Sequence, residues 1–81
     1  MQLAAVPNPA TVKVTLRVTG TIPAGTQVEL VEVATGRPIR TSALAGSEWR
    51  SSVAELAAGV SVARLLHQQQ LLGVMKVVVL H

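Results

Sequence analysis

The stretch GSEWRSSVAELAAG, residues 46–59, decides the fold because it contains Trp49, the one aromatic residue in a chain of 81 residues. We predict a strand from residue 48 to about residue 56 between two glycine turns, with Trp49, Ser51 and Val53 on one face. A lone tryptophan on the apolar face of a strand is more typical of a core than of a ligand platform. Trp49 is therefore the predicted core anchor of a β domain.

The composition indicates a domain with a thin core and much apolar surface. Hydrophobic residues make up 49% of the chain and charged residues only 14%, and cysteine is absent, whereas soluble domains usually carry roughly 25% charged residues. A chain of this length buries only roughly 60–65% of its unfolded surface, and small domains without disulfides often depend on partners. We therefore expect a subunit of something larger, a homo-oligomer or an accessory of another protein.

Three strands are predicted from the remaining first half of the chain. Residues 11–19 alternate Val12, Val14, Leu16 and Val18 with polar side chains, and residues 27–34 form a second strand. A tight reversal at residues 35–36 leads into a third strand, where Pro38 predicts an edge position because proline cannot donate to a ladder.

Two interpretations remain open for residues 52–72. Ser52 and Glu55 have the spacing of a capping box, and residues 61–72 place apolar side chains on one helical stripe, so an α+β fold with a helix in 52–72 is one alternative. Strands are favoured because the neighbouring β elements need partners and the turn glycines recur at hairpin spacing. In that case residues 68–73 form a loop and residues 74–81 form the last strand.

The last strand is apolar on both faces, interrupted only by Lys76. One face of a two-layer sheet normally meets water and carries polar side chains. We therefore expect the second face to be covered by residues 1–10, an extended N-terminal arm before the domain of residues 11–81, or by another subunit. Docking would use apolar burial and strand addition at an edge. The candidate interface consists of Val6, Pro7, Pro9, Leu71, Leu72, Met75, Val77 and Val79.

The segments GTQVELVEVATG and GSEWRSSVAELAAGVSVARL, with a Val- and Thr-rich strand before them, resemble bacterial and phage immunoglobulin-like modules. The resemblance covers about residues 11–80 and implies a small β-sandwich of six or seven antiparallel strands, without any chemistry. The chain departs from the antibody pattern because it lacks cysteine and tyrosine.

Free-standing modules of this size look like the accessory domains of phage capsids and tails. The resemblance therefore implies a structural protein of the virion, such as a capsid decoration or stabilising subunit, whose partners are further copies of itself or a major capsid or tail protein. A cytoplasmic location is the alternative.

Residue types for catalysis are scarce. The chain has no Asp, Cys or Tyr, and Glu29 and Glu32 fall on opposite faces of their strand, so we interpret both as solvated strand charges. His67 and His81 lack nearby acids or thiols and make a poor zinc set. We predict no enzyme activity, no cofactor, no metal and no small-molecule ligand. No apolar stretch reaches the roughly 20 residues of a membrane span.

Two other functions remain as alternatives. A carbohydrate-binding module of the starch-binding type would use Trp49 as a stacking platform. A weak nucleic-acid binder would use the net charge of +3, but the basic residues are scattered and stacking aromatics are missing.

Overall fold

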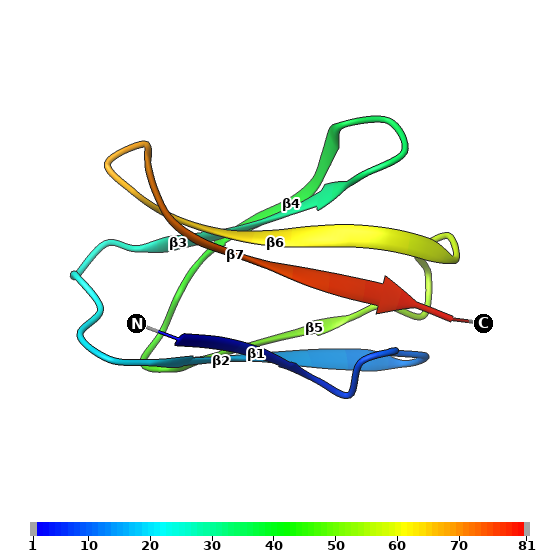
Figure 1. Cartoon of the computed structure of the whole chain (residues 1–81), viewed down its shortest axis with the longest axis horizontal. Coiled ribbons are helices and arrows are strands. Elements are labelled where there is room, and N and C mark those ends of the chain that lie inside the picture. The colour runs from blue at the N-terminus through cyan, green and yellow to red at the C-terminus, as the bar shows by residue number, and fades with distance from the viewer. Residues whose placement is uncertain (1, 81) are drawn as a thin grey trace.

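The computed structural model describes residues 2–80 as an antiparallel β-sandwich of two facing sheets (Figure 1). No helix occurs in this part of the chain. The strands are β1 (Gln2–Val6), β2 (Lys13–Thr19), β3 (Gln27–Glu32), β4 (Arg37–Ala43), β5 (Glu48–Ser52), β6 (Gly59–His67) and β7 (Gln70–Val79).

One sheet has the strand order β1-β2-β5 and the other the order β4-β3-β6-β7. The predicted all-β sandwich is confirmed, and the α+β alternative is wrong. Residues 59–67, which the helical alternative included, form β6, whose backbone pairs with β3 on one side and β7 on the other. Two neighbours satisfy the hydrogen bonds that a helix would have satisfied internally.

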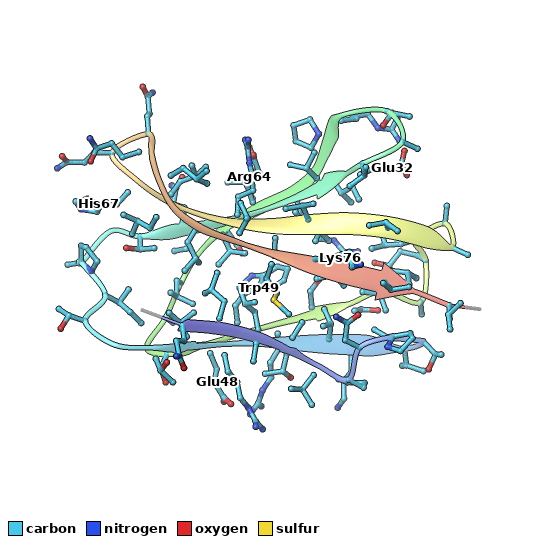
Figure 2. All side chains as sticks on the ribbon, viewed as in Figure 1. Glu32, Glu48, Trp49, Arg64, His67 and Lys76 are labelled. Atoms are coloured by element: carbon cyan, nitrogen blue, oxygen red, sulfur yellow. The ribbon has the colours of Figure 1, made fainter. Side chains whose placement is uncertain are left out.

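The core lies between the sheets and consists almost entirely of small aliphatic side chains. Trp49 is 8% exposed, and its indole Nε1 donates a hydrogen bond to Ser42 Oγ at 2.5 Å. Because β5 and β4 belong to different sheets, this bond joins the two layers. Figure 2 shows Trp49 between the sheets. The buried apolar residues are Ala5, Ala10, Val14, Leu16, Val18, Val28, Leu30, Trp49, Val53, Ala63, Leu65, Val77 and Val79.

The segment predicted as an arm contributes a strand to the sandwich. Residues 2–6 form β1, which pairs antiparallel with β2 and turns Ala5 into the core. Leu3 packs closely against Gly73 of β7, where a Cβ atom would lie 3.0 Å from Leu3 Cδ1. The peptide bonds preceding Pro7 and Pro9 are cis.

The predicted loop at residues 68–73 is wrong, because only Gln68 and Gln69 connect β6 to β7. Both residues have positive φ, 51° and 67°, as in the type I′ turns that match the twist of a hairpin. Such turns usually carry Asn-Gly, so the glutamines gave no sequence signal. By contrast, β4 is an edge strand, as Pro38 predicted.

We predict that Leu30→Ala lowers the free energy of unfolding by about 2–5 kcal/mol, since Leu30 is 0% exposed and the change leaves a cavity. Leu71→Ala is the matched control, because Leu71 is 56% exposed and should change stability by less than about 0.5 kcal/mol. Urea unfolding followed by Trp49 fluorescence measures both. Equal losses in the two variants would contradict this description of the core.

Candidate functional site

The outer face of the three-stranded sheet is polar, as expected for a face in water. Glu48 receives hydrogen bonds from Arg17 at 3.1 Å and from Arg50 at 3.2 Å on this face. Figure 2 shows Glu48 on the far side of its sheet from Trp49. The outward-facing residues of β2 and β5 on this face are Lys13, Thr15, Arg17, Thr19, Glu48, Arg50 and Ser52.

The outer face of the four-stranded sheet is mostly apolar. Cross-strand neighbours on it include Val31 with Val62 and Val60 with Val78. Exposed fractions reach 52% at Val33, 53% at Val74 and 51% at Leu80, so this surface faces water in the isolated chain. We name it the valine face, and it consists of Val31, Val33, Val60, Val62, Val74, Val78 and Leu80.

Few charges interrupt the valine face. Arg64 on β6 lies directly across from Glu29 on β3, and its Nε donates to Glu29 Oε1 at 2.9 Å. This cross-strand ion pair neutralises both charges within the sheet. Lys76 on β7 is exposed and has no ion pair among the described residues. The face therefore combines branched aliphatic side chains with little net charge.

Residues 8–10 close the outer edge of β7 along its second half. The Ala10 amide donates to the Val78 carbonyl oxygen at 2.7 Å, and the Leu80 amide donates to the Ala10 carbonyl oxygen at 2.9 Å. Asn8 Oδ1 accepts from the Val78 amide at 2.9 Å, and Asn8 Nδ2 donates to the Lys76 carbonyl oxygen at 3.1 Å. A partner strand cannot add to this part of the edge, because its backbone groups are already paired.

The structure corrects the predicted interface on β7. Val77 and Val79 are each 1% exposed in the core, and Leu72 and Met75 pack against that core. The prediction that Val77 and Val79 contact a partner is wrong, since both point inward. On the same strand Val74, Lys76 and Val78 face outward, and Leu80 directly after it is also exposed.

The other predicted interface residues are exposed but are not gathered on one surface. Val6 is 43% exposed on the outer side of the three-stranded sheet, and Pro7 and Pro9 follow it. Leu71 lies at the beginning of β7, while residues 8–10 pair with its end. Leu71 pairs with Leu66 on the outer side of the four-stranded sheet and so extends the valine face, whereas Val6, Pro7 and Pro9 lie apart from it.

The remaining candidates for chemistry do not combine into a site. Residues 2–80 contain no cluster of His, Asp, Glu or Cys that could hold a metal ion. His67 Nε2 lies 3.1 Å from the Ala24 carbonyl oxygen, and His81 lies outside the described residues. Trp49 is buried and so presents no free ring face on which a sugar could stack. No helix in the described residues is long and apolar enough to span a bilayer.

The comparison with protein-family models gave no match, and the comparison with curated protein sequences gave none either.

We predict that Asn8→Ala opens the edge of β7, because the Val78 amide loses its acceptor and the Lys76 carbonyl loses its donor. The expected loss of stability is about 1–2 kcal/mol for the two hydrogen bonds. Hydrogen exchange at the Val78 amide should accelerate, while Gln2→Ala, an exposed change on β1, should leave it unchanged. Unaltered exchange at Val78 in Asn8→Ala would contradict the closed edge.

Proposed function

We propose that this chain is a non-enzymatic structural subunit that assembles with further copies of itself through the valine face. The observation that carries the proposal is the contrast between the two outer faces. The outer face of the three-stranded sheet carries charged and hydroxyl side chains, whereas that of the four-stranded sheet carries the valine face. Contiguous exposed apolar surface of this kind marks interaction sites.

A second copy is the partner that the valine face suits best. Two sheets pack face to face about 10 Å apart when both surfaces are apolar and gently twisted, and a two-fold contact requires one surface to complement itself. The paired charges of Glu29 and Arg64 cause no repulsion between copies. Lys76 has a flexible aliphatic stem that can carry its charge to the rim.

The size of the face is also adequate for an interface. The four strands of this sheet have 6, 7, 9 and 10 residues, and with about 4.8 Å for each strand the whole outer face of the sheet is on the order of 500 Å². Two such faces would bury on the order of 1,000 Å² together, close to the roughly 1,200 Å² at which specific interfaces begin. We therefore expect a reversible dimer, which contacts to a larger assembly would reinforce.

The larger assembly that we propose is a phage virion, with the chain as an immunoglobulin-like accessory subunit of the capsid or tail. Support comes from the sequence resemblance to phage and bacterial immunoglobulin-like modules and from the arrangement of seven strands in two sheets, which suits a sandwich of that kind. Mass spectrometry of phage particles purified from the source culture tests whether the chain is part of a virion. The chain should be found in the particles in amounts comparable to other structural proteins, and its absence from them would show that it is not part of one.

The self-association itself is tested by light scattering behind a sizing column. We predict that the wild-type chain exceeds the 8.5 kDa monomer mass, and that Val74→Lys combined with Val78→Lys raises the dissociation constant at least tenfold by placing two further cations beside Lys76. Thr15→Lys combined with Thr19→Lys adds the same charge to the polar face and should leave the mass unchanged.

Trp49 fluorescence verifies that both double variants fold. A wild-type chain that remains monomeric at high concentration would contradict the proposal, and so would equal effects of the two double variants.

A further inference from the structure

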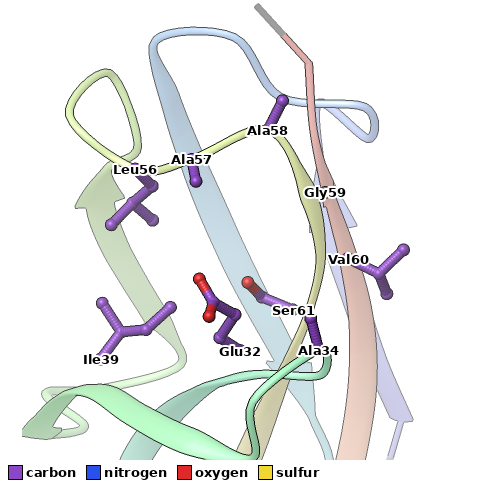
Figure 3. Close-up of a pocket in the computed structure, with 9 residues that line it drawn as sticks. All are labelled: Glu32, Ala34, Ile39, Leu56, Ala57, Ala58, Gly59, Val60 and Ser61. Atoms are coloured by element: carbon purple, nitrogen blue, oxygen red, sulfur yellow. The ribbon is translucent and has the colours of Figure 1, made fainter.

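A cavity of about 240 Å³ opens at the end of the sandwich where β3 ends and β6 begins (Figure 3). It is smaller than the roughly 300 Å³ at which pockets for small-molecule ligands begin. Its volume is suited to a single side chain rather than to a cofactor. The cavity is lined by Glu32, Ala34, Ile39, Leu56, Ala57, Ala58, Gly59, Val60 and Ser61.

Glu32 gives this cavity a charge at a position where the fold otherwise places apolar residues. It follows Val28 and Leu30, both 0% exposed, in the inward-facing row of β3. Glu32 is half-buried, and its partner across the sheet is Ser61, which is 5% exposed. Figure 3 shows the Glu32 carboxylate and the Ser61 hydroxyl side by side at the cavity. The interpretation of Glu32 as a solvated strand charge is therefore corrected.

Glu32 is also the one glutamate in the described part of the chain without an ion pair. Its Oε1 accepts a hydrogen bond from Thr35 Oγ1 at 2.9 Å, and its cross-strand neighbour Arg37 is exposed and makes no ion pair with it. A half-buried carboxylate that has one neutral donor and no cation can still accept further hydrogen bonds. The other glutamates are paired: Glu29 with Arg64, Glu48 with Arg17 and Arg50, and Glu55 with Arg40.

The walls of the cavity suit the stem of a basic side chain. Ile39 and Leu56 are half-buried apolar residues, and Figure 3 shows both beside the Glu32 carboxylate. Lysine and arginine bury their methylene groups along apolar surface while the charged head reaches a polar partner. Hydrogen bonds between such a head and a carboxylate are among the stronger ones in proteins.

We propose that this cavity binds a lysine or arginine side chain presented by the protein that docks on the valine face. Val60 lines the cavity at the end of the sheet, while its side chain points away from Glu32 and is 40% exposed on the valine face (Figure 3). A partner that covers the valine face and extends past the end of the sheet at Gly59 is therefore placed to insert a side chain beside Glu32. The source of the side chain rests on the proposed function, whereas the cation site itself rests on the cavity and on Glu32.

The test uses a blocked arginine, N-acetyl-arginine N-methylamide, titrated into the ¹⁵N-labelled full chain at a concentration where it is monomeric. We expect saturable shifts of the amide signals of Gly59, Ser61 and their neighbours, with a dissociation constant in the millimolar range. The citrulline analogue has the same shape without the charge and should give shifts at least tenfold weaker. Equal binding of the two compounds would overturn the proposal.

Two variants locate the site. Glu32→Gln keeps the size of the side chain and should weaken binding of blocked arginine at least tenfold. Glu48→Gln, which removes a glutamate from the polar face, should leave binding unchanged. If Glu32→Gln binds as well as the wild type, or if the wild type gives no shifts, the proposal is wrong.

Two further measurements test separately where the cation comes from and whether the chain self-associates. Agmatine carries the same guanidinium as a free metabolite, and binding of agmatine without binding of blocked arginine would exclude a protein side chain as the occupant. Self-association of the Glu32→Gln chain is measured by light scattering. If the wild-type chain self-associates but gives no amide shifts with blocked arginine, the cation site alone is refuted. If the wild-type chain is monomeric but binds blocked arginine, the dimer alone is refuted.

Discussion

The structure depends on a last strand that is apolar on both sides. The inner side of β7 completes the core with Val77 and Val79, each 1% exposed, and burying a valine side chain contributes about 1.5 kcal/mol or more. An open edge on such a strand would be a template for aggregation. Residues 8–10 remove that template along half of the strand, since Ala10 and Asn8 pair with its backbone. What remains for a partner is the outward face and the first half of the β7 edge.

The same chain compensates for its lack of large side chains by bringing the two sheets close together. Gly73 leaves room for Leu3 where β1 meets β7, and Ala5, Ala10 and Ala63 are all buried. Trp49 is the one large aromatic side chain in this core and hydrogen-bonds to the opposite sheet. A core of small residues buries little area per residue, so covering the exposed valines by association would add burial that the fold alone does not supply.

Sequence patterns predicted the strands that have one apolar and one polar face. They did not predict the orientation of a strand whose two faces are both apolar. Alternation identified β2, and Pro38 identified an edge strand, because both signals come from local chemistry. On β7 both faces are apolar, so periodicity could not say that Val77 points inward and Val74 outward. The sequence did not predict that residues 2–6 pair with β2, because the prolines that follow them indicated an extended arm. It also did not predict the turn at Gln68, because glutamine rarely adopts positive φ.

The sequence gives one indication of the candidate cation site, the position of Glu32 in its strand, but only the three-dimensional structure shows what this position implies. Glu32 is in phase with Val28 and Leu30, so the period of the strand already placed it on the core side. Only the fold shows that this position lies at the open end of the sandwich, next to Val60 of the valine face. Apolar burial supplies affinity but little orientation, whereas a single part-buried charge favours one cation and disfavours acidic partners. In the proposed assembly the valine face would hold a partner, and Glu32 would fix the register of that partner.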